Sequence, residues 1–142
     1  MATIKQLSIF IENKSGRLHE IMELIGRANV RIIAGTVADT SEYGIFRLIA
    51  SDPDKVQSVL KENNVSTQIS EVFAISTNSK AGSFIENLRY FSANGVSIEY
   101  MYCFSIENHA FAIIRTNDNC AAQRVIDSCG INTLTIENLA KV

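Results

Sequence analysis

The feature that most constrains the fold is an internal repeat, in which residues 66 positions apart match along the chain. The polar turn at residues 13–18 (NKSGRL) returns at residues 79–84 (SKAGSF), placing Gly16 on Gly82, an offset of 66. The same offset, without a gap, aligns Val30 with Val96, Ile32 with Ile98, Asp52 with Asp118, Gln57 with Gln123, and Val59 with Val125. This agreement in residue identity and order predicts two copies of one fold.

The first copy begins with a strand and a helix. Leu7, Ile9 and Ile11 alternate with polar residues, which predicts a half-buried strand. Beyond the turn the apolar spacing becomes that of one helical face and predicts a helix over residues 16–28. Its expected apolar stripe consists of Leu18, Ile21, Met22, Ile25 and Ala28.

A hairpin, a second helix and a last strand follow. Residues 30–38 and 43–50 are rich in β-branched and aromatic residues and flank the polar turn 39–42, which predicts a hairpin. Asp52 and Pro53 supply an N-cap and a first-turn proline for a helix that ends at residues 63–64. Residues 65–75 then predict a strand.

The element order is therefore βαββαβ, twice, in an α+β protein. Each copy is expected to form a four-stranded antiparallel sheet with both helices on one face, with units at residues 1–70 and 71–142. The sheet face without helices would otherwise be exposed, so we expect two units to pair. They could pair within the chain, by strand exchange, or across a homodimer.

Composition excludes several classes of function. The net charge is −2 and the basic residues are scattered, so nucleic-acid binding is not expected. No apolar run approaches the roughly 20 residues that span a bilayer, and no signal-peptide pattern begins the chain, so a cytoplasmic protein without membrane attachment is expected.

The reactive residue types form no recognisable catalytic or metal-binding pattern. Cys103, Cys120 and Cys129 are odd in number and widely spaced, so we interpret them as buried small thiols. His19 and His109 lack the spacing of metal ligands. We expect a protein that is not an enzyme and holds no metal and no cofactor.

The glycine turn could bind an anion. The start of a helix presents free backbone N–H groups, here expected from Ser15, Gly16 and Arg17, to a group such as a carboxylate. Asn13 could contact a ligand, or it could be a turn residue that bonds its own backbone. Lys14 could add charge or be solvated.

The two copies differ in the strand that follows the first helix. Residues 100–102 are Tyr, Met and Tyr, whereas residues 34–36 are Ala, Gly and Thr. Large residues opposite small ones predict either interlocking packing or one wall of a pocket, and packing is favoured.

The turn at residues 13–18 and the stretch at residues 38–48 (ADTSEYGIFRL) resemble the ACT domain family, and specifically its small proteins made of two tandem ACT domains. This resemblance covers essentially the whole chain. It implies ferredoxin-like βαββαβ units that bind an amino acid at the interface between two units and regulate an enzyme.

The resemblance also implies two unequal ligand sites. The first site is expected to comprise Asn13, Lys14, Ser15, Gly16, Arg17 and Leu18, opposite Ser97, Ile98, Glu99, Tyr100 and Tyr102. The second, weaker site is expected to comprise Ser79, Lys80, Ala81, Gly82, Ser83 and Phe84, opposite Arg31, Ile32 and Ile33. Ser79 replaces the ligand-contacting Asn13, and Ser15 and Ala81 stand where the family often has proline.

The leading hypothesis is a non-catalytic amino-acid sensor that acts in trans on a partner enzyme or transporter. One alternative is a structural assembly module whose ligand site has decayed. Another is an RNA-binding protein, since residues 43–47 (YGIFR) faintly match the aromatic third strand of RNA-recognition modules.

Overall fold

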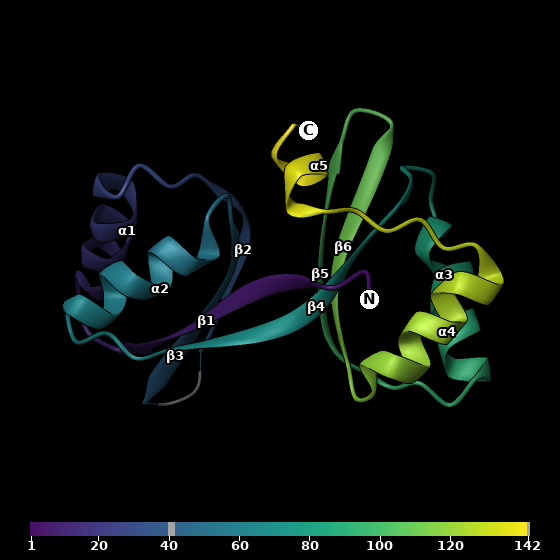
Figure 1. Cartoon of the computed structure of the whole chain (residues 1–142), viewed down its shortest axis with the longest axis horizontal. Coiled ribbons are helices and arrows are strands. Elements are labelled where there is room, and N and C mark those ends of the chain that lie inside the picture. The colour runs from purple at the N-terminus through teal and green to yellow at the C-terminus, as the bar shows by residue number, and fades with distance from the viewer. Residues whose placement is uncertain (40–41, 142) are drawn as a thin grey trace. The chain divides into compact units, whose positions relative to one another are not determined.

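The computed structural model describes residues 1–39 and 42–141 and divides the chain into two compact units (Figure 1). The N-terminal unit is Lys5–Ser70, and the C-terminal unit is Glu71–Val142 together with Met1–Ile4. Within the C-terminal unit, the backbone N–H of Ala2 donates to Oε1 of Gln123 at 2.7 Å. The first four residues thus group with the second copy of the repeat.

The N-terminal unit follows the predicted βαββαβ order. Its elements are β1 (Ile4–Glu12), α1 (Arg17–Arg27), β2 (Ile32–Asp39), β3 (Tyr43–Ala50), α2 (Pro53–Glu62) and the start of β4 (Thr67–Asn78). Strand β3 pairs antiparallel with both β1 and β2. The predicted hairpin lies at β2 and β3; Thr40 and Ser41 of its turn lie outside the described residues.

The core of this unit lies between the strands and the two helices. It is formed by buried residues of alternating strand positions and of one face of each helix, among them Leu7, Ile9, Ile11, Ile21, Ile25, Phe46, Leu48, Val56 and Leu60. The predicted stripe of α1 is right for Ile21 and Ile25, which are at most 1% exposed. It is wrong for Leu18 and Met22, which remain 39% and 42% exposed at the edge of the helix face.

The C-terminal unit repeats this arrangement. After the rest of β4 come α3 (Ser83–Ala93), β5 (Ile98–Ile106), β6 (His109–Thr116), α4 (Asn119–Cys129) and α5 (Ile136–Ala140). Strand β6 pairs antiparallel with β4 and β5. Its core includes Phe73, Ile75, Phe91, Val96, Ala112, Ile114, Ala122, Val125 and Ile126.

The repeat extends to backbone detail. The register of β2 against β3 shifts between Ile32 and Ala34, and that of β5 against β6 shifts between Ile98 and Tyr100, at equivalent positions. Each second helix is capped by an aspartate, because Asp52 accepts from its third following N–H at 3.2 Å and the equivalent aspartate does so at 3.0 Å. Two bulges and two caps at one offset confirm the duplication.

The copies differ at their last element. The fourth strand of the C-terminal unit is reduced to one bridge between Ile75 and Thr133. Two residues later Thr135 forms a capping box with Asn138 and turns the chain into α5, which ends the extended segment.

The sequence-based expectation of buried thiols is wrong for two of the cysteines. Cys103, on β5, and Cys120, in the first turn of α4, are both exposed.

No helix in the described part of the chain is long and apolar enough to cross a membrane.

Candidate functional site

In each copy of the repeat, the residue just before the first helix is a glycine in the left-handed backbone conformation. Gly16 has φ 82° and ψ −5°, and Gly82 has φ 78° and ψ 6°; neither helix has a side-chain N-cap bond. No atom lies within 4 Å of where a Cβ on Gly16 would stand. Glycine is therefore required there by the backbone conformation rather than by crowding.

The N–H groups expected from the sequence at the start of α1 are only partly available. The Arg17 N–H donates to the carbonyl of Lys14 at 3.2 Å, so it is already occupied. Among the described residues, the N–H groups of Ser15 and Gly16 have no acceptor, and neither do those of Leu18 and His19 in the first turn of the helix. The free donors therefore stand on both sides of Arg17.

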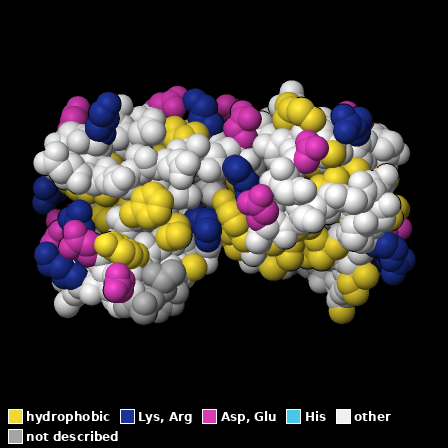
Figure 2. Space-filling model, turned by 90° about the horizontal axis from the view of Figure 1, so that it is seen from below, with side chains coloured by type: hydrophobic (Ala, Val, Ile, Leu, Met, Phe, Trp, Pro, Cys, Tyr) yellow, Lys and Arg dark blue, Asp and Glu magenta, His cyan; other side chains and the backbone are white. Residues whose placement is uncertain are grey.

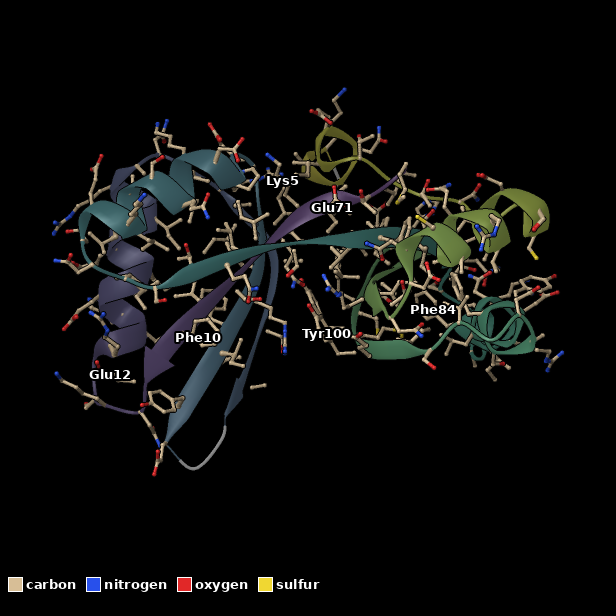
Figure 3. All side chains as sticks on the ribbon, turned by 60° about the horizontal axis from the view of Figure 1, so that its bottom comes forward. Lys5, Phe10, Glu12, Glu71, Phe84 and Tyr100 are labelled. Carbon is tan, nitrogen blue, oxygen red and sulfur yellow. The ribbon has the colours of Figure 1, made fainter. Side chains whose placement is uncertain are left out.

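A small pocket of about 160 Å³ lies beside this turn. Its lining residues come from the turn, from α1 and from all three neighbouring strands: Ile11, Glu12, Asn13, Lys14, Leu18, Val37 and Gly44. Asn13, Lys14 and Leu18 were predicted ligand contacts and lie together here, whereas Ser15, Gly16 and Arg17 do not line the pocket. Figure 3 shows Glu12 at the end of β1.

Sequence reasoning missed Glu12, Val37 and Gly44. The adjacency of Glu12 to Asn13 was a signal, because a carboxylate, an amide and an ammonium occur in succession at residues 12–14. Val37 and Gly44 carried no such signal, since only the pairing of β3 with β1 and with β2 brings them to the turn. The amide of Asn13 has no hydrogen-bond partner within the described residues, so the self-bonded alternative for this side chain does not hold here.

The second turn is more nearly satisfied by its own atoms. Oδ1 of Asn78 accepts from the Lys80 N–H at 3.0 Å, and the Ile85 N–H donates to the Gly82 carbonyl at 3.0 Å. A Cβ on Gly82 would lie 3.3 Å from Cδ1 of Ile85. Of the N–H groups described in this first turn, that of Phe84 has no acceptor. The turn thus has less to offer a ligand than its counterpart.

The strands expected to face the turns divide between two sheet faces. Ser97 and Ile98 line a groove beside α3, on the helix side of β5. Tyr102 pairs with Ile113, which alternates with the helix-facing core residues, so Tyr102 and Tyr100 lie on the opposite face. Figure 3 shows Tyr100 on β5. The juxtaposition of these strands with the turns of the other unit remains a prediction.

Titratable groups offer little sign of catalytic chemistry. The described residues contain no cluster of three or more His, Cys, Asp or Glu placed to hold a metal ion. On α3, the Tyr90 hydroxyl donates to Oε1 of Glu86 at 2.9 Å, and this hydrogen bond, with the nearby carboxylate charge, raises the pKa of Tyr90. The pair lies one turn apart on an exposed helix surface, which is typical of a structural contact.

A duplicated βαββαβ fold in which the first helix of each copy starts at a glycine turn defines a class of small two-unit modules. The chain belongs to the ACT domain family: the family model described as an ACT domain pair matches residues 2–142. Units of this family are generally regulatory, amino-acid-binding modules, and no catalytic family is indicated. The ferredoxin-like fold inferred from the sequence is thereby confirmed.

Solved structures agree with this assignment. The protein BT0572 from Bacteroides thetaiotaomicron is similar, with 38% identity, a TM-score of 0.95, and 99% of this chain and 98% of that chain covered. The regulatory subunit of aspartate kinase from Thermus thermophilus is 12% identical with a TM-score of 0.59, covering 87% and 90% of the two chains. The corresponding subunit from Thermus flavus is 14% identical with a TM-score of 0.57, covering 87% of this chain and 90% of that chain. The latter two show likeness of fold. The comparison with curated proteins finds no match.

Proposed function

We propose that this protein is a non-catalytic amino-acid sensor whose principal ligand site is the Gly16 turn. The observation that carries the proposal is the set of groups gathered at this turn. The carboxylate of Glu12, the unpartnered amide of Asn13, the ammonium of Lys14 and the free N–H of Leu18 belong to residues that line one pocket, and the free N–H of His19 follows in the same helical turn. An amino acid presents the complementary set, because its backbone is a carboxylate beside an ammonium.

The chemistry assigns roles to the groups. The N–H groups of Leu18 and His19, with the positive end of the helix dipole and Lys14, suit the ligand's carboxylate. Glu12 and the amide oxygen of Asn13 suit its ammonium. These groups bind what every amino acid shares. Selectivity is therefore proposed to come from a facing strand, with residues 97–102 opposite this turn and residues 31–33 opposite the Gly82 turn.

The test is thermal unfolding of the chain with each common amino acid in turn. A ligand at 100 times its Kd adds about 2.7 kcal/mol to the free energy of unfolding, a readily measured shift. Asn13→Ala is expected to weaken the response to the amino acid that binds, whereas Ser79→Ala, its repeat-related control, has a smaller effect. Equal effects would refute the unequal-site proposal. A panel without any response would refute the sensor.

The regulatory output is proposed to act in trans, on a separate enzyme or transporter, from a cytoplasmic homodimer. Ligand binding would then favour one arrangement of an interface between units over another, and the partner would respond to that change in population. Light scattering tests the dimer directly, since the chain mass is 15.7 kDa. A mass of one chain, with and without the bound amino acid, would contradict it.

The RNA-binding alternative is weakened by the burial of one of its two aromatic residues. Within the YGIFR stretch of β3, Tyr43 is 53% exposed, but Phe46 is 5% exposed and packs in the core beneath the helices. A buried ring cannot stack on a base. Single-stranded RNA in the same thermal assay is the matching negative control. The decayed-site alternative predicts no amino-acid response from either turn.

A further inference from the structure

A groove of about 640 Å³ lies wholly within the C-terminal unit, between the last turns of α3 and the start of β5. Its walls are mostly apolar and its rim carries two serines and one arginine: Leu88, Arg89, Phe91, Ser92, Gly95, Val96, Ser97, Ile98 and Met101. Figure 2 shows hydrophobic side chains reaching the surface on the face that it displays. The volume lies within the range typical of small-molecule sites.

The first copy of the repeat differs at the positions that shape this groove. Met101 corresponds to Gly35, and a Cβ on Gly35 would lie 2.9 Å from Cε1 of Phe46, so a core ring already fills that space. Arg89 corresponds to Glu23, which is engaged by side chains of its own helix at 2.8 and 3.3 Å. The groove's apolar floor and its positive rim are therefore properties of one unit, beyond what the shared fold requires.

Arg89 supplies the charge that a ligand would need to meet. Its residue is exposed, and its guanidinium forms no hydrogen bond or ion pair within the described part of the chain. A guanidinium binds a carboxylate through two parallel N–H donors. No acidic side chain lines the groove, so nothing there suits an ammonium.

We propose that this groove, between α3 and β5, is a second ligand site that takes an apolar monocarboxylate without an ammonium group, such as a branched or aromatic carboxylic acid. The carboxylate pairs with Arg89 at the rim, and the apolar body lies against Leu88, Ile98 and Met101. The polar group of this site differs from those of the Gly16 turn, which carries an acidic group for an ammonium. Residues 97–102, which supply Ser97, Ile98 and Met101 to the groove, are also proposed to face the Gly16 turn, so Arg89, which belongs to the groove alone, is the residue that separates the two proposals.

The test uses the full chain labelled with ¹⁵N and titrated with 3-phenylpropanoate. Saturable shifts are expected at the amides of Leu88, Ser92 and Gly95, which line the groove outside the segment proposed to face the Gly16 turn. Arg89→Gln should weaken binding about fivefold to tenfold, as loss of a charged hydrogen bond does, and Arg89→Glu, which restores the first-copy charge, should weaken it further. Arg124→Gln, on exposed α4 of the same unit, is the matched control and should leave the Kd unchanged.

Two further probes test the chemistry. The neutral 3-phenylpropanamide should bind about as weakly to the native chain as the acid binds to Arg89→Gln, and L-phenylalanine should bind in the groove more weakly than the acid. Shifts confined to residues 13–18 and 97–102, an unchanged Kd for Arg89→Gln, or equal binding of amide and acid would each overturn the proposal. The amino-acid panel with Asn13→Ala reports on the sensor independently of these results.

Discussion

Replacing Gly16 by alanine tests whether the central turn depends on backbone conformation alone. Gly16 has φ 82°, in the left-handed region, and a Cβ placed there meets no atom within 4 Å. Steric overpacking therefore does not contribute to the stability difference between the native protein and Gly16→Ala. What remains is the cost of holding an L-residue in a conformation that places its Cβ close to the following carbonyl oxygen.

The magnitude follows from two opposing terms. The left-handed conformation costs alanine roughly 1–2 kcal/mol, while alanine's smaller freedom in the unfolded chain offsets about 0.4–1 kcal/mol. We expect a net loss of about 1 kcal/mol in the free energy of unfolding, or about 2–4 °C in Tm for a chain of this size. Urea unfolding followed by circular dichroism measures this directly.

Gly26 is the matched control on the same helix. It lies in the last turn of α1, is exposed, and also has open space around its added Cβ, but its φ is not in the left-handed region. Gly26→Ala should raise the stability by roughly 0.5–1 kcal/mol, because alanine favours a helix. The two substitutions should thus have opposite signs. If Gly16→Ala stabilises the protein as Gly26→Ala does, the conformational reasoning about the turn is refuted.

Three further predictions follow from other parts of the chain. Gly35→Ala should cost about 1–3 kcal/mol by overpacking, since its Cβ would lie 2.9 Å from a phenyl ring, and chemical unfolding showing no loss would contradict this. Asp52→Ala and Asp118→Ala should each cost about 1 kcal/mol by removing equivalent helix caps; markedly unequal losses would mean that the caps are not equivalent. The hydrogen bond from Tyr90 to Glu86 raises the pKa of Tyr90, so it stabilises the fold below the ordinary tyrosine pKa, and this stabilisation is lost as the pH rises through the raised pKa. Glu86→Gln should therefore lower the pKa of Tyr90 in a spectrophotometric titration. An unchanged pKa would show that Glu86 is not the cause of the shift.

The candidate site was predictable in part. The glycine, the helix that follows it and the polar residues 13–14 could be recognised, because they are consecutive in the chain. The occupied N–H group of Arg17 could not be predicted, since it depends on the chain turning back to the carbonyl of Lys14. Val37 and Gly44 reach the pocket only through strand pairing, which periodicity does not specify.

The sequence by itself determined the duplication, the element order and the two glycine turns, because periodicity, capping residues and left-handed glycines are local properties. The structure adds that β2 and β5 shift their register at positions 66 residues apart. Only the tertiary structure decided which apolar residues are buried. Leu18 and Met22 share the α1 stripe with Ile21 and Ile25, yet they are 39% and 42% exposed, because helical spacing does not specify how much of a helix face the sheet covers. Likewise, the groove beside α3 exists because Met101 and Arg89 replace a glycine and a paired glutamate across distant elements, a combination that no local pattern expresses.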